Sequence, residues 1–293
     1  MSGEITSFER LEMQRETLRK RAICVIIPTY NNRGTITDVV SRSLVQCDDV
    51  IVVCDGCTDD TLDLLNKMVR RPTILYLKRN RGKGGALKEG FKYARGAGFA
   101  YAITLDGDGQ HFPEDIPLML EANIKHPGAL IVGERQFEKN AERSAGSKFA
   151  NSFSNFWFGI QTGHFLKDTQ TGYRLYPLKK LYGLPLLTSR YEAELELMVF
   201  ASWHGVRLVS NPVNVYYPPK EERVSHFRPG KDFARITVLN SILCLLALVY
   251  ALPLAILRWS WIIFKTVYSL LFFIITSMFV ATPLASLYMS IGE

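Results

Sequence analysis

The sequence is poor in cysteine: its five cysteines are scattered, and only Cys54 and Cys57 form a Cys-x-x-Cys pair. A zinc site built on such a pair needs a second one, and none is present. We therefore expect these two residues to be small side chains in a tight turn. Residues 1–21 are densely charged and lack an apolar core, which excludes a secretory signal peptide. We thus expect the main part of the chain to be cytosolic, with reduced thiols.

The sequence also lacks a long basic run and any interleaving of basic with aromatic residues, which argues against nucleic acid as a partner. Lys and Arg nevertheless exceed Asp and Glu by 35 to 28, a net charge of +7. That excess favours anionic lipid or phosphorylated substrates as partners. Apolar residues are spaced among the charges of 1–21, so this stretch predicts a short amphipathic N-terminal segment.

From residue 22 onward, apolar runs alternate with helical patterns. Strands are expected at 22–28, 50–53, 73–77, 100–105 and 129–132, and helices at 35–45, 58–69, 84–97 and 113–126. This alternation predicts an α/β fold with a doubly wound, mainly parallel sheet. Beyond residue 140 the alternation fades. There we expect helices at 144–160 and 191–203, and β-structure at 172–176 and 206–217.

Polar clusters follow these strands at the points where the strands end. They are 29–32, 54–57, 79–83, 106–111 and 133–135. Ligands of open α/β sheets bind outside the carboxyl ends of the strands, where such clusters would meet. The sequence therefore predicts one site at this edge.

The cluster Asp106-Gly-Asp-Gly-Gln-His111 has three interpretations: a calcium loop, a plain acidic turn, or a metal site for a phosphorylated substrate. A calcium loop of the EF-hand type is excluded, because Gln110 and Pro117 stand where acids are required. Asp106 and Asp108 can offer oxygens to one Mg²⁺ or Mn²⁺ ion, and Gln110 can add a carbonyl oxygen. We expect this metal site, since the motif ends a buried strand.

The basic, glycine-rich stretch 79–85 can cradle a diphosphate, with Arg81 and Lys83 as candidate contacts. It is not a Walker motif, because glycine follows Lys83 where Ser or Thr is required. The alternative is a solvated basic turn. An acid pair beside such a loop indicates a nucleoside-diphosphate donor rather than a triphosphate.

Four motifs, at 28–32, 54–59, 80–84 and 106–111, resemble those of the family 2 glycosyltransferases of GT-A fold. The chain looks most like their dolichol- and polyprenyl-phosphate sugar transferases, over about residues 22–217. The resemblance implies that Pro28, Tyr30 and Asp55 line the nucleotide pocket. It also implies that Asp106, Asp108 and Gln110 hold the metal.

The stretch Asp168-Thr-Gln-Thr-Gly-Tyr-Arg174 resembles the acceptor-side segment of the same family, so Arg135 and Arg174 would face the acceptor phosphate. The chain departs from the family at Cys54-Asp-Gly-Cys57, where Asp-Asp-Gly-Ser is usual, and this leaves the nucleotide open. His226 and Arg228, just before the apolar C-terminal part, are candidate contacts to a lipid headgroup. Glu192, Glu194 and Glu196 are expected to lie mostly on a solvated helix face, with the alternative that one of them reaches the site.

These features predict an inverting, metal-dependent sugar transfer to a membrane lipid, most simply a polyprenyl phosphate. Such a phosphate is mostly dianionic at pH 7 and needs no strong base. Transfer to a hydroxyl of a glycolipid or other lipid stays an alternative, as does a non-catalytic nucleotide-sugar-binding membrane protein. A homo-oligomer is compatible with the sequence.

Two uncharged segments, 236–257 and 266–289, each exceed the roughly 20 residues that span a membrane. Pro253 and Pro283 would bend them, so two core helices or a surface-lying hairpin stay as alternatives. We expect a two-helix membrane hairpin joined to the catalytic part by a linker, 218–235. Basic residues are denser before the first segment than between the two, which predicts a multi-pass protein with its catalytic domain in the cytosol.

Overall fold

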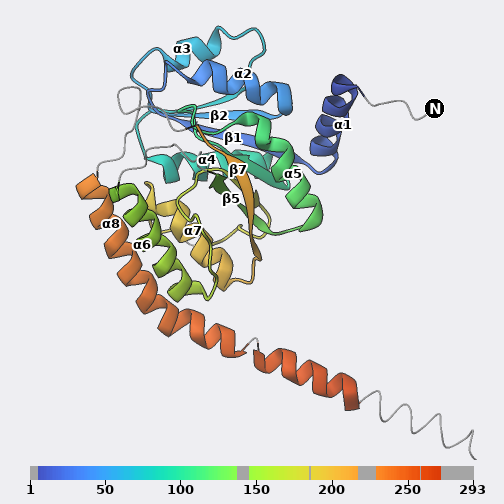
Figure 1. The fold of residues 1–293 in the computed structure, drawn as a ribbon, viewed down its shortest axis with the longest axis vertical. Coiled ribbons are helices and arrows are strands. Elements are labelled where there is room, and N and C mark those ends of the chain that lie inside the picture. Colours follow the sequence, from blue (N-terminus) through green and yellow to red (C-terminus); the bar gives the residue numbers. More distant parts are fainter. Residues whose placement is uncertain (1–5, 137–144, 185, 217–228, 258, 272–293) are drawn as a thin grey trace, which may run out of the picture. The chain divides into compact units, whose positions relative to one another are not determined.

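A computed structural model describes residues 6–136, 145–184, 186–216, 229–257 and 259–271. Within these ranges one seven-stranded sheet has the order β3-β2-β1-β4-β6-β5-β7 (Figure 1). The strands are β1 (Ile23–Thr29), β2 (Val50–Asp55), β3 (Thr73–Leu77), β4 (Tyr101–Thr104), β5 (Leu130–Gln136), β6 (Arg174–Pro177) and β7 (Leu208–Asn214). All neighbouring strands run parallel except where β6 pairs with β4 and β5. The predicted mainly parallel, doubly wound sheet is confirmed.

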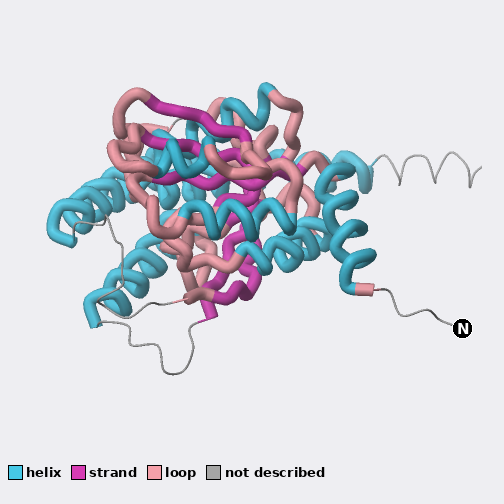
Figure 2. Tube along the Cα trace, turned by 90° about the horizontal axis from the view of Figure 1, so that it is seen from above, coloured by secondary structure: helices cyan, strands magenta, loops and turns pink. Residues whose placement is uncertain are grey.

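Helices cover both faces of this sheet, as Figures 1 and 2 show. In the first half of the chain they are α1 (Ser7–Lys20), α2 (Ile36–Gln46), α3 (Thr61–Asn66), α4 (Lys83–Gly96), the 3₁₀ turn η1 (Pro113–Asp115) and α5 (Ile116–Lys125). Val25 and Ile27 of β1 pack into the core on the α2 side, whereas Ile26 faces Gly90 of α4. A strand buried on both faces needs an unbroken apolar run, which is why this one could be read from the sequence.

Two helices begin at other residues in the structure than the sequence predicts. The helix expected at 58–69 starts only at Thr61, because the Asp59 carboxylate accepts hydrogen bonds from the Thr61 and Arg33 backbone N–H groups. These bonds hold the preceding residues in a loop. The helix expected at 113–126 opens with the 3₁₀ turn η1 before α5 begins.

The reversed direction of β6 determines which residues meet at the ligand edge of the sheet. Thr104 pairs with Arg174 in the antiparallel β4–β6 ladder, so β6 begins where β4 ends. Thr104 Oγ1 also donates to the Gly172 carbonyl oxygen at 2.7 Å. The segment before β6 is thereby brought beside the loop that follows β4.

Three further helices follow β5: α6 (Ala145–Thr162), α7 (Glu192–Trp203) and α8 (Pro229–Leu246). Buried hydrogen bonds tie them together, since the Gln161 amide donates to Asn240 Oδ1 at 3.0 Å and the Trp203 indole donates to the Gln161 carbonyl oxygen at 2.7 Å. Helix α8 starts within the stretch predicted to be a linker. The remainder of that linker lies outside the described residues.

The chain divides into two compact units, residues 1–244 and 245–293. The described part contains one helix long and apolar enough to cross a membrane, Ala234–Leu271, with a mean hydropathy of 2.2. Its π-helical stretch η3 (Ala247–Ala251) precedes Pro253, where a proline removes a helical hydrogen bond. Residues 259–265, expected to connect two helices, are helical. The two-helix hairpin is therefore not confirmed, and most of 266–289 lies outside the described residues.

Candidate active site

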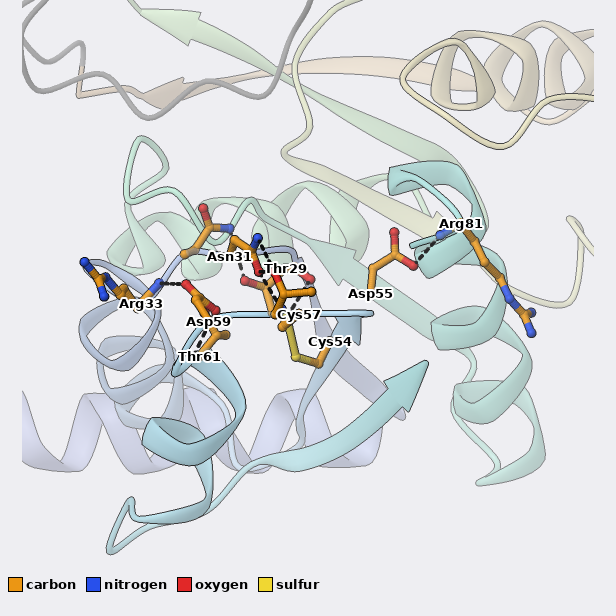
Figure 3. Close-up of a disulfide and its surroundings, with 11 residues drawn as sticks. Thr29, Asn31, Arg33, Cys54, Asp55, Cys57, Asp59, Thr61 and Arg81 are labelled. Atoms are coloured by element: carbon orange, nitrogen blue, oxygen red, sulfur yellow. Dashed lines mark hydrogen bonds between the residues drawn. A yellow bond between two sulfur atoms is a disulfide. The ribbon is translucent and has the colours of Figure 1, made fainter. Parts of the chain in front are cut away.

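Asp55, at the end of β2, holds the basic loop that follows β3. One carboxylate oxygen accepts the Arg81 backbone N–H and the other accepts that of Gly82, both at 2.8 Å (Figure 3). Burial raises the pKa of Asp55, and the two backbone hydrogen bonds oppose this shift. The Arg81 side chain itself turns outward and pairs with Glu89 at 2.8 Å. Asp55 thus fixes the shape of the loop that the sequence assigns to the donor diphosphate.

The loop after β1 lies beside the turn that follows β2. Asn31 Oδ1 accepts the Thr58 backbone N–H at 2.8 Å. Pro28 is buried in the end of β1, and Tyr30 next to it is partly exposed. Between these loops, Cys54 and Cys57 are joined by a disulfide, which differs from the reduced thiols that the sequence predicts.

Lys83, the first residue of α4, bridges two carboxylates. Its Nζ lies 2.6 Å from Asp106 Oδ1 and 2.8 Å from Glu194 Oε2. Burial alone would lower the pKa of Lys83, but the two carboxylates outweigh it and hold that pKa above its ordinary value. Burial likewise opposes the ionisation of Asp106, yet Lys83 keeps the pKa of Asp106 below its ordinary range. Both groups are therefore charged at neutral pH.

The surroundings of Asp108 favour its ionised form less than the surroundings of Asp106 do. Burial and the neighbouring charge of Asp106 raise the pKa of Asp108 to about 6, although its Oδ1 accepts the Gln110 backbone N–H at 3.0 Å. Two carboxylates that repel one another are a common sign of a functional site. A divalent cation between them would remove the repulsion.

The donor set suits a cation that binds together with its substrate. Among the described residues no cluster of three or more His, Cys, Asp or Glu side chains can hold a metal ion. Mg²⁺ commonly uses one or two carboxylates and completes its shell with water and substrate phosphates. Asp106 and Asp108, with Gln110 beside them, fit such a partial shell.

His111 contacts the backbone of the acidic loop 106–111 through its ring. It is buried, and its Nδ1 accepts the Asp106 backbone N–H at 3.1 Å, so the ring is neutral with its proton on Nε2. Burial lowers the pKa of His111 to about 4. This nitrogen positions the Asp106 backbone and is not free to bind metal.

Gly172 lies directly over the Lys83–Asp106 pair. A Cβ atom at this position would lie 2.5 Å from Lys83 Nζ and 2.6 Å from Asp106 Oδ2. Only glycine allows the backbone this close approach. The segment before β6 therefore closes one side of the acidic loop.

The two arginines predicted to bind the acceptor differ in exposure: Arg135 is partly accessible, whereas Arg174 is buried. Arg135 forms a two-pronged ion pair with Asp168, with Nε–Oδ2 at 2.6 Å and Nη2–Oδ1 at 2.9 Å, and its side chain is 16% exposed. Arg174 is 1% exposed, and its guanidinium donates to the Glu194 and Thr169 carbonyl oxygens. The position of Arg174 does not support an acceptor contact, because the side chain is buried and both of its terminal nitrogens donate inside the protein. His226 and Arg228 lie outside the described residues.

Glu194 is a site residue that sequence reasoning did not single out. Glu192, Glu194 and Glu196, expected on a solvated face, are all buried in α7. The other residues of α7 are mostly apolar, and a helix that is apolar all round is buried. A buried acid needs a cation or hydrogen-bond donors; Glu194 pairs with Lys83 and Arg174, whereas Glu196 accepts from the Leu187 and Thr188 backbone N–H groups.

Comparison with known proteins identifies relatives for most of the chain. A family model described as Glycosyl transferase family 2 matches residues 24–179. A UDP-N-acetylglucosamine–dolichyl-phosphate N-acetylglucosaminyltransferase of Methanococcus voltae is 27% identical over 67% of this chain and 86% of that protein. A polyprenol monophosphomannose synthase of Mycolicibacterium smegmatis is 28% identical over 64% of this chain and 75% of that protein.

One solved structure shares the fold at low identity. It is glucosyl-3-phosphoglycerate synthase from Mycobacterium tuberculosis in complex with Mn²⁺, UDP-glucose and phosphoglyceric acid. The TM-score is 0.60 at 17% identity, with 81% of this chain and 83% of that chain covered. This likeness supports the GT-A-like arrangement of the sheet.

Proposed function

The chain belongs to glycosyl transferase family 2 and is a nucleotide-sugar glycosyltransferase, and from this premise we propose its acceptor, cofactor and stereochemistry. The proposed reaction moves a sugar from a nucleoside-diphosphate sugar to a polyprenyl phosphate, with inversion at the anomeric carbon. It takes place at the cytoplasmic face of a membrane. The observation that carries the proposal is the partly buried Lys83–Asp106–Asp108 cluster, which Gly172 contacts.

Asp106, Asp108 and Gln110 are proposed to hold Mg²⁺ or Mn²⁺, which when bound supplies positive charge to the departing diphosphate. The solved structure of glucosyl-3-phosphoglycerate synthase holds Mn²⁺ together with UDP-glucose, in line with this choice of metal. Arg81 stays a proposed contact to the same diphosphate, and its side chain would have to leave Glu89 to make that contact. Pro28 and Tyr30 lie at the edge proposed for the nucleoside.

Lys83 stabilises the charge that develops during transfer. As the bond between the anomeric carbon and the diphosphate oxygen breaks, its electron pair stays on the diphosphate, close to Lys83 Nζ. A preorganised cation in a buried site stabilises such charge more than water would. An oxygen of the acceptor phosphate forms the new bond from the opposite face of the sugar, and no base is required because that phosphate is already mostly dianionic.

Arg135 is proposed to meet the acceptor phosphate. Asp168 holds its guanidinium in one orientation, and the side chain stays partly exposed. Arginine is suited to phosphate because its planar fork donates two parallel hydrogen bonds. His226 and Arg228 stay proposed headgroup contacts.

An apolar surface on α6 and α8 supports a membrane acceptor. Exposed side chains on these two adjoining helices are Phe149, Phe156, Ile160, Val238 and Ile242. Large exposed apolar patches mark protein or membrane contacts. Because most of α8 forms the first part of the apolar helix Ala234–Leu271, we propose that this surface lies at the lipid headgroups.

The proposed topology keeps two membrane segments from the predicted 236–257 and 266–289, with the first beginning beyond the part of α8 that packs on α6, and places the catalytic unit in the cytosol. Basic residues that precede the first segment are Lys220, Arg223, Arg228, Lys231 and Arg235, and cytoplasmic flanks carry such an excess. Fusion of a periplasm-active reporter after residue 293 tests this arrangement. A C-terminus on the far side would contradict the two-span topology.

The activity is tested with the purified full chain in detergent, a panel of nucleotide sugars, Mn²⁺ or Mg²⁺, and polyprenyl phosphate. We expect metal-dependent formation of a lipid-phosphate sugar with inverted anomeric configuration, measured by NMR. Asp108→Asn should abolish it, whereas Asp63→Asn, an exposed acid of α3, should not. Transfer only to a glycolipid hydroxyl, with a carboxylate-dependent pH limb, would contradict the phosphate acceptor. Donor binding without any transfer would contradict the enzyme assignment.

A further inference from the structure

Cys54 and Cys57 form a bonded pair at the end of β2. Their Cα atoms lie 5.9 Å apart, within the range of about 4.4–6.8 Å that disulfides adopt. Cys54 is fully buried, and Cys57 is partly exposed. The two cysteines enclose Asp55 and Gly56, so the bond closes a short ring around a residue of the proposed donor site.

This turn touches the loops on both sides of it (Figure 3). Asp55 holds the backbone of residues 81 and 82, as described above. Gly56 has φ +68°, and a Cβ there would lie 2.5 Å from the Asn80 backbone nitrogen. On the other side, the Thr58 backbone N–H donates a hydrogen bond to Asn31 Oδ1. A change in the shape of the 54–57 turn would therefore be transmitted to the 79–82 and 29–33 loops.

We propose that Cys54 and Cys57 are a redox modification site that exchanges with dithiols and disulfides, and that its oxidation state sets the affinity for the nucleotide. This inference rests on the proposed donor site. A thiolate of an external dithiol attacks Sγ of the more exposed Cys57, and the S–S bond breaks. Cys54 leaves as a thiolate and takes up a proton.

The second thiol of the external dithiol then resolves the mixed disulfide. Cys57 is released as a thiol, so two electrons and two protons have passed to the pair, and the external dithiol has become a disulfide. Oxidation by a disulfide is the reverse. In a reducing cytosol the dithiol is the resting form, and disulfides there are usually transient or redox-sensing.

Reduction changes what the turn can do. Cys57 Sγ lies 3.6 Å from the Thr29 carbonyl oxygen. A thiol at this position can donate a hydrogen bond to that oxygen or rotate away, whereas a disulfide sulfur has no proton and is held in place. The disulfide therefore preorganises the turn around Asp55. Preorganisation strengthens binding by reducing the ordering cost, so the oxidised form should bind nucleotide more tightly.

The test measures the redox state and nucleotide binding separately in the full chain. The protein is incubated with reduced or oxidised dithiothreitol, and peptide mass spectrometry determines whether Cys54 and Cys57 are joined by a disulfide. Titration with UDP and with GDP, each with Mn²⁺, then gives Kd for both forms. We expect the oxidised form to bind one of these nucleotides about 3- to 10-fold more tightly. Cys57→Ser should bind with one Kd under both conditions, and Cys54→Ala provides a second variant in case one folds poorly.

Cys244→Ser is the matched control, because Cys244 is a free cysteine in α8, and this variant should keep the full redox response. Absence of the 54–57 bond after oxidation, or equal Kd values for the two forms, would overturn the inference alone. If neither form binds UDP or GDP while Cys54 and Cys57 still interconvert, the proposed donor site fails together with the coupling.

Discussion

Replacing Gly172 with alanine tests whether the Lys83–Asp106 pair must keep its position during sugar transfer. The added methyl carbon would lie 2.5 Å from Lys83 Nζ and 2.6 and 2.9 Å from the Asp106 carboxylate oxygens. Since non-bonded heavy atoms prefer about 3.5–4.0 Å, these atoms must separate by about 1 Å.

The backbone at position 172 is poorly able to yield. Thr104 Oγ1 donates to the Gly172 carbonyl oxygen at 2.7 Å, and the Gly133 N–H donates to the Tyr173 carbonyl oxygen at 2.8 Å. The two charged side chains should therefore move instead. A displacement of about 1 Å in a catalytic arrangement can cost about 10²-fold in rate. Overpacking costs about 1–3 kcal/mol, and we expect the lower end because the atoms that yield are side-chain ends.

The assay is kcat and KM for lipid glycosylation, together with urea unfolding of the same preparation. Gly172→Ala should lose about 100-fold in kcat and about 1 kcal/mol in unfolding free energy. Gly96→Ala is the matched control, because a Cβ at position 96 of α4 would meet nothing within 4 Å. A Gly172→Ala enzyme with an unchanged kcat would refute the reasoning. So would a loss of activity fully explained by unfolding.

Three further predictions concern the titrating and buried groups of the site. Burial and Asp106 raise the pKa of Asp108 to about 6, so the unliganded fold loses stability as pH rises through about 4 to 6. Asp108→Asn should raise Tm at pH 7 by a few degrees without metal and abolish the stabilisation by Mn²⁺ in a thermal-shift assay. Burial lowers the pKa of His111 to about 4, so its contribution to stability is lost as pH falls from about 6.5 to 4. His111→Gln should reduce the difference in urea stability between pH 7 and pH 5, and an unchanged difference would contradict the assignment. Arg174→Lys should lower Tm without changing KM for the acceptor, and a raised KM at unchanged Tm would restore the acceptor role.

The sequence predicted the parts of the fold whose signals are local. Strands β1 and β2 are buried on both faces and are therefore continuous apolar runs. The acidic motif at 106–111 and the basic loop at 79–83 follow strands of one parallel set, so their meeting at one edge follows from topology. Asp55 was predicted at this edge, but its role in holding the basic loop depends on backbone N–H groups and has no sequence pattern.

What escaped prediction depends on pairing between distant segments. The direction of β6 brings Gly172 over Asp106, and nothing in the residues around position 172 encodes that direction. Arg174 was assigned to the acceptor phosphate because residues 168–174 resemble a family segment, yet β6 lies between β4 and β5, where the Arg174 side chain enters the interior. Glu194 was assigned to solvent from its charge, although the apolar residues around it in α7 indicated burial. In each case tertiary context overrode a local signal.

The charges of the site indicate why donor and metal should bind together. Lys83 and Arg174 contribute two positive charges beside three carboxylates, Asp106, Asp108 and Glu194, so the cluster carries an excess of one negative charge when all are ionised. A diphosphate entering alone would add negative charge to a site that already repels it. A divalent cation more than offsets this excess, and the cluster, now positive, can then accept the diphosphate beside Lys83. Nucleotide affinity should therefore depend steeply on the metal in the wild type. In Asp108→Asn, which removes one negative charge and one ligand, weak binding should become less dependent on metal.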